Sequence, residues 1–278
     1  MPEHTEAVAG HYTTGGLLDR LLGALRAAGK DVERLTIDDL APVDELHSRR
    51  RAATADLARM LSPAAGQSVV DMGSGLGGPA RYLAHGFGCT VTGFDLTDEF
   101  VTAARELTRR CGLAERVRFE QGSVLELPAN DASFDLAWSQ NVAMNIANRA
   151  GWYAEIRRVL KPGGRLALQD VTLGETAEPH YPVVWADTPA TSFLHTPAAT
   201  RAMLEAAGFR VLAWEDNTDV ALAEMDAARA AGRPRPAEPP ILGMHLVIGP
   251  LYREKTRNSE RNLREGRTRL INAVLQRA

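Results

Sequence analysis

The stretch Val69–Ala84, which reads VVDMGSGLGGPARYLA, decides the fold class of this chain. A short apolar run ends in an acidic residue, four glycines and a serine crowd the next six positions, and an apolar helical pattern follows. Glycines at such a turn permit positive φ angles and let the backbone approach a ligand closely. The pattern predicts a strand, a tight turn and a helix that hold a nucleotide-like ligand. A tight turn without any ligand is the alternative.

The rest of the chain repeats this alternation of strands and helices. Alternation of this kind predicts a doubly wound, Rossmann-like, mostly parallel sheet of the α/β class. We expect seven strands, at residues 69–71, 89–96, 116–122, 134–141, 165–172, 209–216 and 268–278.

Two segments lie outside this alternation. Residues 1–62 carry helical leucine spacing and predict an N-terminal helical lid, which leaves 63–278 as the Rossmann-like domain. Residues from about 219 to 266 predict an insert before the last strand. The basic run 253–269 within it contains acidic residues, which favours a solvated helix over a nucleic-acid site.

Two carboxylates indicate which ligand the glycine turn serves. Asp71 stands directly before the turn, where it would repel a pyrophosphate but tolerate an ammonium group. Asp95 ends the next strand, 18 residues after Gly77, and a carboxylate at that place can accept both ribose hydroxyls. A ligand with a ribose and a cationic tail fits both positions. S-adenosylmethionine is such a ligand.

The chain resembles the class I S-adenosylmethionine-dependent methyltransferases. The resemblance rests on VVDMGSGLGGPARYLA, VTGFDLT, QGSVLELP, FDLAWSQNVAMNI and LKPGGRLALQD, and it covers about residues 45–217. Three further stretches resemble the branch of sarcosine/dimethylglycine N-methyltransferases and small-molecule natural-product tailoring methyltransferases: HYTTGGLLDRLLGALRAAGKD, PVDELHSRRRAAT and PHYPVVWADTPATSFLHTP.

This resemblance implies a set of cofactor contacts. The methionine part of the cofactor would lie on the glycine turn, the ribose on Asp95, and the adenine beside Leu96. The remaining residues implied are Gly73, Ser74, Gly75 and Gly77 at the turn, Ser123 and Val124 at the adenine edge, and Gln140 near the sulfonium. Many class I enzymes have Asp at the position of Ser123, so this chain replaces a charged acceptor with a neutral one.

Candidate catalytic bases are His47, His180 and His245, because a methyl acceptor that carries a proton must lose it. We expect His47 to face the substrate, with the basic residues Arg49–Arg51 favouring its neutral imidazole. Packing of the lid is the alternative role for His47.

Other side chains are candidates for the cofactor or substrate. Arg51 could reach the cofactor carboxylate or remain a surface charge, and Tyr12 could cover the cofactor. Trp185 could bind a cationic amine or pack in the core. The remaining substrate candidates are Asn141, Asn145 and Tyr181.

Composition narrows the function further. The net charge is only −3. Nucleic-acid methyltransferases of this fold often carry an Asn/Asp-Pro-Pro-aromatic motif after the fourth strand, which binds the amino group of a flipped base. At that position this chain reads Ser139-Gln140-Asn141-Val142 and lacks the motif. We therefore expect a small-molecule acceptor and no nucleic acid. The two cysteines lack metal-ligand spacing, so we expect no metal. Apolar runs are too short for a bilayer and no signal peptide is evident, so we expect a cytoplasmic protein.

The sequence therefore predicts transfer of a methyl group to a nitrogen or carbon atom of a small molecule, by a protein that could form a homodimer. An amine, a glycine derivative and an indole or alkaloid remain equal possibilities for the acceptor. A protein that keeps the pocket without methylating, such as a pericyclase-like one, is an alternative. A nicotinamide-dependent oxidoreductase would need an aliphatic residue at Asp71 and a Tyr-x-x-x-Lys donor, which we do not find.

Overall fold

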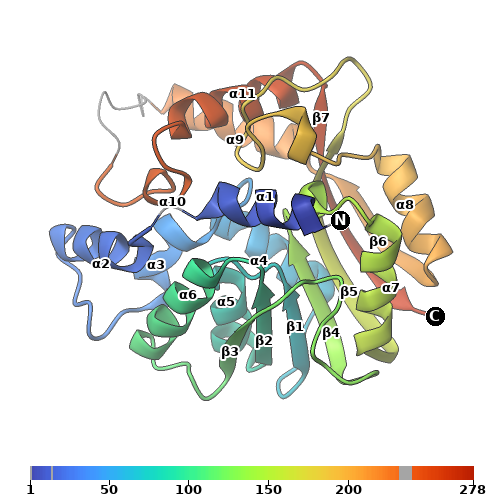
Figure 1. The fold of residues 1–278 in the computed structure, drawn as a ribbon, viewed down its shortest axis with the longest axis horizontal. Coiled ribbons are helices and arrows are strands. Elements are labelled where there is room, and N and C mark those ends of the chain that lie inside the picture. Colours follow the sequence, from blue (N-terminus) through green and yellow to red (C-terminus); the bar gives the residue numbers. More distant parts are fainter. Residues whose placement is uncertain (1, 14, 232–239) are drawn as a thin grey trace.

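A computed structural model describes residues 2–13, 15–231 and 240–278. Its centre is one seven-stranded sheet in the order β3-β2-β1-β4-β5-β7-β6 (Figure 1). All neighbours pair in parallel except β7, which runs antiparallel to both β5 and β6. The predicted doubly wound fold and its strands are confirmed: β1 Ser68–Met72, β2 Thr90–Asp95, β3 Val117–Gln121, β4 Phe134–Gln140, β5 Leu160–Leu173, β6 Phe209–Asp216 and β7 Thr268–Arg277.

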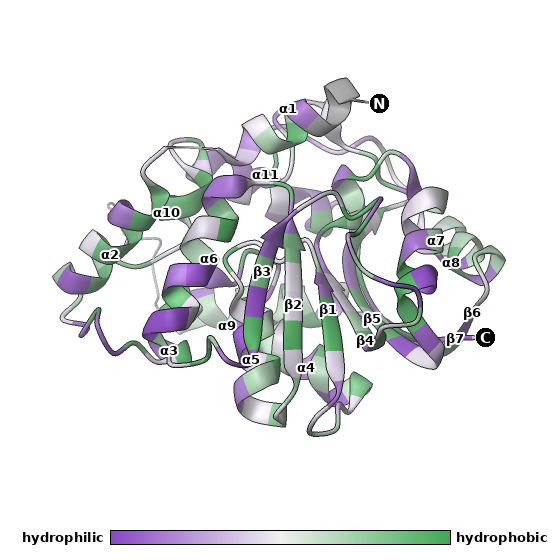
Figure 2. Ribbon diagram, turned by 60° about the horizontal axis from the view of Figure 1, so that its bottom comes forward, coloured by the Kyte–Doolittle hydropathy of each residue, from purple (hydrophilic) through white to green (hydrophobic). Residues whose placement is uncertain are grey.

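Successive residues of the central strands pack on opposite faces of the sheet, as the two-residue period of a strand requires. Val69 faces a cluster with α4 (Arg50–Leu61) and α5 (Gly78–Phe87). Val70 faces a second cluster with α7 (Arg149–Val159) and α8 (Pro197–Ala206). The central strands are therefore buried on both sides, whereas the edge strand β3 alternates polar and apolar residues, as Figure 2 shows.

The predicted lid is smaller than residues 1–62. Leu57 and Leu61 of α4 are fully buried beside the sheet, so α4 belongs to the layer that covers it. The helices α2 (Leu17–Ala27) and α3 (Ile37–Asp44) form a third cluster with α6 (Asp98–Arg110). Only α1 (Pro2–Tyr12) remains as a cover, and it crosses the carboxyl-terminal edge of the sheet in Figure 1.

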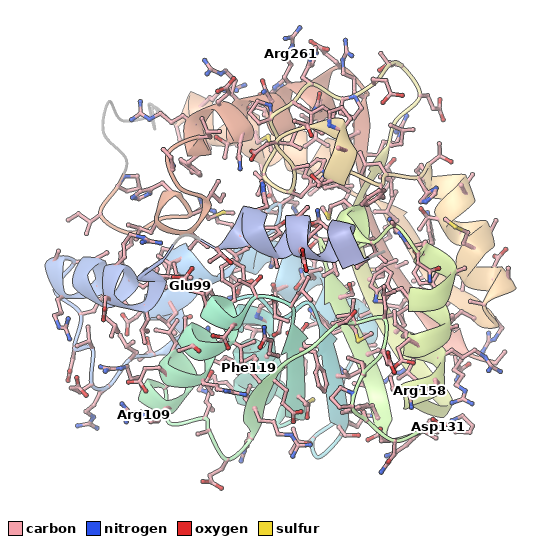
Figure 3. All side chains as sticks on the ribbon, in the orientation of Figure 1. Glu99, Arg109, Phe119, Asp131, Arg158 and Arg261 are labelled. Carbon is pink, nitrogen blue, oxygen red and sulfur yellow. The ribbon has the colours of Figure 1, made fainter. Side chains whose placement is uncertain are left out.

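The turn between α1 and α2 is anchored to the domain. Gly15 and Gly16 both have positive φ, which favours glycine. The amides of Gly15 and Leu17 donate to the carboxylate of Glu99 on α6, at 3.1 and 2.8 Å. Glu99 is labelled at this junction in Figure 3. A fixed turn with two glycines separates the cover from the body of the protein.

The predicted insert contains three helices within its described part, namely α9 (Thr218–Ala230), α10 (His245–Ile248) and α11 (Tyr252–Arg264). Most of its proline-rich stretch, residues 232–239, lies outside the described residues. Both ends of the insert meet at one point: the amide of Asn217 donates to the Leu270 carbonyl at 2.8 Å, and the amide of Leu270 donates to Thr218 Oγ1 at 3.0 Å.

The short helices η1 (Ala143–Asn145) and η2 (Pro189–Thr191) complete the elements. Within the described residues, no helix has the length and apolar character needed to cross a bilayer.

Candidate active site

A cavity of about 610 Å³ opens at the carboxyl-terminal ends of β1, β2 and β4. Ligand sites of α/β sheets form at this edge, where the strand order reverses. Here β1 is the reversal point, because the chain proceeds from it outward through β2 and β3 and then returns to β4. The cavity is bounded by the glycine turn after β1, by α1, by η1, and by α10 and α11 of the insert.

The glycine turn brings bare backbone to the cavity. Gly73 and Gly75 line it and have φ of 76° and 51°. A Cβ on Gly73 would lie 2.6 Å from Cγ2 of Val142, so the close packing of β1 against the segment after β4 requires glycine. The amides of Gly73 and Ser74 donate to the Phe94 carbonyl at 2.8 and 2.9 Å, which holds the turn in place.

Two carboxylates flank this turn, Asp95 and the buried Asp71. Asp95 accepts from the amide of Gly75 at 2.8 Å and from the amide of Thr97 at 2.9 Å. Burial raises the pKa of Asp95, although these amides oppose the shift. Asp71 is 2% exposed, and its Oδ2 has no hydrogen-bond partner among the residues the structure describes. Burial, with the charges of Asp95 and Glu45, raises the pKa of Asp71 to about 8. Asp71 is therefore a carboxyl group that lacks a cation.

Most of the other residues expected at the cofactor also line the cavity, namely Tyr12, Ser74, Leu96, Ser123, Val124 and Gln140. Besides Tyr12, two of them already use their polar atoms within the protein. Ser123 Oγ accepts from the amide of Leu125 at 3.2 Å. The side chain of Gln140 contacts three neighbours: Nε2 donates to Gln169 at 2.7 Å, while Oε1 accepts from Trp138 at 2.9 Å and lies 3.2 Å from Thr54 Oγ1.

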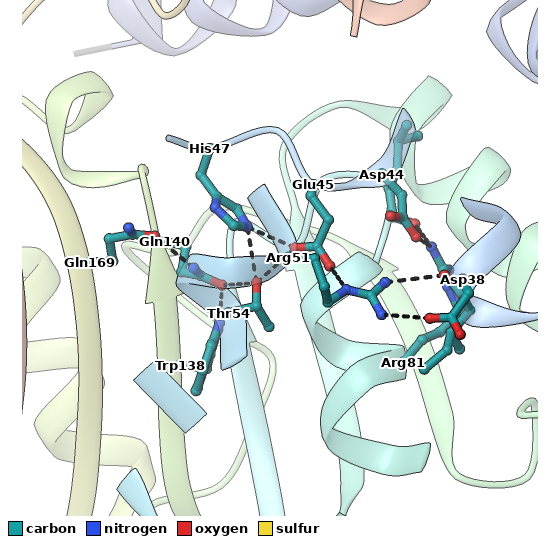
Figure 4. A network of polar contacts seen from close by, with 12 residues as sticks. Asp38, Asp44, Glu45, His47, Arg51, Thr54, Arg81, Trp138, Gln140 and Gln169 are labelled. Carbon is teal, nitrogen blue, oxygen red and sulfur yellow. Dashed lines mark hydrogen bonds and ion pairs between the residues drawn. The ribbon is translucent and has the colours of Figure 1, made fainter. Parts of the chain in front are cut away.

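His47 lines the cavity from the loop between α3 and α4, as expected, but its charged neighbour is not a cation. Its Nε2 lies 2.9 Å from the buried carboxylate of Glu45 (Figure 4). Basic residues were expected beside this ring, and that expectation is wrong. Arg49 pairs with Asp56 and Glu224, and Arg51 pairs with Glu45. The Nδ1 atom lies 3.3 Å from the Ser48 carbonyl, so both ring nitrogens face acceptors.

The network around His47 continues into the sheet. Thr54 donates to Glu45 at 2.7 Å and also contacts Gln140 at 3.2 Å. Figure 4 shows this chain from His47 through Thr54 to Gln140. The loop that follows contains two consecutive residues with positive φ, Arg49 at 63° and Arg50 at 48°. A strained backbone of this kind persists only where its surroundings fix it. The side-chain network and the fixed backbone of the following residues thus determine the position of His47 together.

A second polar link fastens α1 over the cavity. Tyr12 donates its hydroxyl to Asn145 Oδ1 at 3.0 Å, and burial raises the pKa of Tyr12, so it stays a donor. Asn145 Nδ2 donates to the carbonyls of Trp185 and Thr191 at 2.9 and 3.2 Å. Asn145 therefore ties three segments together, and its nitrogen is already occupied. Trp185 lines the cavity and is 5% exposed, with Nε1 donating to Ser192 at 2.9 Å.

The end of β4 adds one strained polar residue. Asn141 lines the cavity with φ of 54°, in the left-handed region. Its Oδ1 is buried and has no hydrogen-bond partner within the described part of the chain. An unpaired buried acceptor at a cavity wall is costly unless a ligand supplies the donor. The expectation that Asn141 faces a ligand thus matches its surroundings.

Five expected residues do not line the cavity. His180 is turned to Glu265 at 2.8 Å, and His245 lies beside Tyr252 on the outer side of α10, so neither is placed to act as a base there. Arg51 donates hydrogen bonds to Glu45 and to the Ile37 carbonyl. Tyr181 packs under the insert. Gly77 is a packing glycine, since a Cβ there would lie 2.4 Å from the Phe119 ring.

Among the cavity residues that sequence reasoning missed are a histidine and a lysine, His11 of α1 and Lys255 of α11. They lie 244 positions apart in the chain, yet Nζ of Lys255 is 3.4 Å from Nε2 of His11. Lys255 belongs to the basic run that was read as a solvated helix face. Its spacing on α11 contains the signal, because Lys255, Asn262 and Leu263 form the buried stripe of that helix.

Comparison with known proteins agrees with this site. The model of the methyltransferase domain family matches residues 70–168. Methyltransferase GfsG of Streptomyces halstedii is 35% identical over 140 residues, which are 50% of each chain. Sarcosine/dimethylglycine N-methyltransferase of Halorhodospira halochloris is 29% identical over 68% of each chain. The chain thus spans half the length of the first of these relatives.

Among solved structures, geranyl diphosphate C-methyltransferase from Streptomyces coelicolor, in a complex containing S-adenosyl-L-homocysteine, superposes with a TM-score of 0.71. The superposition covers 99% of this chain and 98% of the other, at 17% sequence identity. This likeness concerns the fold. It extends over α1 and the insert as well as over the sheet.

Proposed function

Because the chain contains a domain that belongs to the class I S-adenosylmethionine-dependent methyltransferases, we propose that it transfers the methyl group of S-adenosylmethionine to a nitrogen or carbon atom of a small molecule. The observation that carries the proposal is the pair of carboxylates at the glycine turn: Asp71, which is buried, and Asp95, which lines the cavity. A cationic ligand with a ribose fits this pair.

The residues present fit S-adenosylmethionine. The unpartnered Oδ2 of Asp71 suits an ammonium group, and an ion pair there would remove the cost of the buried carboxylate. Asp95 offers a carboxylate to a diol, while Gly73 and Gly75 leave room for the amino-acid part. A pyrophosphate would meet the carboxyl groups of Asp71 and Asp95 at the same place, which disfavours a nicotinamide dinucleotide.

When bound, S-adenosylmethionine supplies an electrophilic methyl group on a sulfonium sulfur. The protein has to align the acceptor with it and exclude water, and positioning alone can contribute roughly 7–11 kcal/mol. Tyr12 and Asn145 hold α1 over the cavity and so exclude water. Asn141 offers Oδ1 as an acceptor at the cavity wall.

We assign His47 the handling of the acceptor's proton. Nε2 donates to Glu45 Oε2 at 2.9 Å, so the lone pair that could take the acceptor's proton is that of Nδ1, whose contact with the Ser48 carbonyl is long, at 3.3 Å. Glu45 is in turn held by Arg51 and Thr54, and their hydrogen bonds together with the His47 contact outweigh burial and lower the pKa of Glu45 to about 2. The carboxylate is therefore charged and able to orient the ring.

The experiment that tests this function has two parts. Calorimetry with S-adenosylhomocysteine and with NAD distinguishes the two nucleotide classes, and we expect binding of the first only. Release of S-adenosylhomocysteine is then measured from the protein, S-adenosylmethionine and a panel of amines, glycine derivatives and indoles. Binding without any turnover would favour the protein that keeps the pocket and does not methylate. A homodimer and a cytoplasmic location remain predictions.

A further inference from the structure

The cavity has two ends of different charge. Its lining carboxylates among the described residues are Asp44, Asp71, Asp95 and Glu126, and they come from α3, from the carboxyl-terminal parts of β1 and β2, and from the segment after β3. We call the opposite part the acceptor end. It is lined by residues of α1, η1, α10 and α11 and by the segment after β5: Val8, His11, Met144, Val184, Trp185 and Lys255, with Val247 and Ile248.

Lys255 is the buried charge of the acceptor end. The side chain is 6% exposed, and its Nζ pairs with Asp187 Oδ1 at 2.9 Å. Asp187 is 53% exposed, so this partner stands at the water side of the pair while the lysine faces the cavity. An ammonium group has three donors, and one carboxylate oxygen occupies one of them.

His11 does not satisfy the remaining donors of Lys255. Its Nε2 lies 3.1 Å from the Val184 carbonyl and 3.4 Å from Nζ of Lys255. A ring nitrogen that donates to the carbonyl cannot also accept from the ammonium. The Val184 carbonyl is the shorter of the two Nε2 contacts, and Nδ1 lies 3.4 Å from Asp187 Oδ2, so His11 takes at most one of the three donors of Lys255. Among the described residues, at least one donor of this buried ammonium group is then left for a ligand in the cavity.

We propose that Lys255 is a specificity-determining residue that holds a carboxylate of the methyl acceptor, whose remaining body is apolar. This inference rests on the proposed methyl transfer. The carboxylate would supply the missing acceptor, and Val184, Trp185 and Met144 would contact the apolar body. A free amine without an acid group would bring a second positive charge next to Lys255, so it is disfavoured.

The competing account is that Lys255 only fastens α1. His11, Asp187 and Lys255 come from α1, from the segment before η2 and from α11, so their contacts do join three segments. The two accounts differ in what a change of charge does. A fastener affects every ligand alike, whereas a recognition residue affects ligands according to their charge.

The test uses three probes with the same apolar body: octanoate, 1-octanol and octylammonium. Their affinities are measured by calorimetry on the full chain saturated with S-adenosylhomocysteine. We expect octanoate to bind at least tenfold more tightly than 1-octanol and octylammonium to bind weakest. Octanoate that binds no better than 1-octanol, or that does not bind at millimolar concentration, overturns the proposal.

Three variants sharpen the test. Lys255→Met should reduce the preference for octanoate over 1-octanol to less than threefold, and Lys255→Arg should retain most of it. Asp187→Asn, which removes the competing carboxylate, should strengthen octanoate binding. If Lys255→Met and Asp187→Asn instead weaken all three probes equally and lower the melting temperature together, Lys255 is a fastener and the proposal fails.

S-adenosylhomocysteine affinity separates this inference from the proposed function. Asp71 and Asp95, which carry the cofactor, are not altered in these variants, so cofactor affinity should stay within twofold of the unaltered chain. Failure of the unaltered chain to bind S-adenosylhomocysteine would contradict the proposed function itself. Cofactor binding without any preference among the three probes would contradict only the role of Lys255.

Discussion

The cofactor end and the acceptor end of the cavity are built in different ways. The cofactor end uses the turns that follow β1, β2 and β3, so Asp71, Gly75 and Asp95 stand where the sheet ladder puts them. The acceptor end is assembled from α1, η1 and the insert, joined by side chains such as Tyr12, Asn145 and Lys255. One end is fixed by backbone pairing and the other by side-chain contacts.

This difference separates chemistry that the fold provides from chemistry that this particular chain provides. A parallel sheet with its glycine turn creates a place for a nucleotide whatever surrounds it. The place for the acceptor depends on a few polar contacts between distant segments. Changes at the cofactor end should therefore alter cofactor affinity, and changes at the acceptor end should alter turnover and selectivity.

The largest effect is expected from His47, which lies between the two ends. His47→Ala should lower turnover by about 10²-fold or more, the scale of a general base, while S-adenosylhomocysteine affinity stays within twofold. His180→Ala is the matched control, because that ring lies outside the cavity and should leave turnover unchanged. Near-normal turnover of His47→Ala with a lower melting temperature would assign this residue to packing.

Asp95→Ala should weaken cofactor binding by about 1–3 kcal/mol, the range for a lost hydrogen bond to a charged group. Asp98→Ala, an exposed aspartate three residues further on, serves as the control. Calorimetry with S-adenosylhomocysteine measures both. Unchanged affinity in Asp95→Ala would remove the ribose assignment and with it the contrast between the two ends.

Asp71 makes cofactor affinity depend on pH. Because the pKa of this carboxyl is raised to about 8, it is mostly protonated in the free protein below that pH, and a bound ammonium favours its ionised form. S-adenosylhomocysteine affinity should therefore rise with pH by up to about tenfold per unit, or about 1.4 kcal/mol, and level off above pH 8. Asp71→Asn should abolish the slope. A flat profile for the unaltered chain would place the ammonium elsewhere.

The smallest effect is expected at the contact that closes α1. Tyr12→Phe leaves Asn145 Oδ1 without its donor and should cost about 0.5–1.5 kcal/mol of local stability. Hydrogen exchange of the α1 amides should become severalfold faster, with global unfolding by urea unchanged. Tyr82→Phe removes the same hydroxyl from α5 and should not affect α1. Equal exchange in both variants would mean that α1 is held by other contacts.

The sheet and the cofactor end were predictable because their signals are local. Strand and helix periods, the glycine turn and the carboxylates after two strands all lie within short windows of sequence. The strand at 209–216 was predicted to the residue. The cavity side of Lys255 was missed, because the buried stripe of α11 contains a lysine and an asparagine beside Leu263, and the partners of Lys255 on α1 and near η2 are distant in the sequence.

The histidines show the same limit. His47, His180 and His245 look alike in sequence, and each stands near polar neighbours. Their surroundings differ in the folded chain: His47 contacts Glu45 and Thr54, two and seven residues away, whereas His180 contacts Glu265, 85 residues away. Arg51 was a candidate for the cofactor carboxylate, whereas in the structure it pairs with the carboxylate of Glu45, six residues away in the chain.

The junction at Thr218 and Leu270 has a consequence for how such proteins diversify. Both ends of the insert are held at this point by two hydrogen bonds, and the sheet continues beyond it through β6 and β7. Because loop-closure entropy grows slowly with length, a segment of another length could be joined at the same two residues at small cost. Exchange of that single cassette would bring a new wall to the acceptor end and leave the nucleotide pocket untouched.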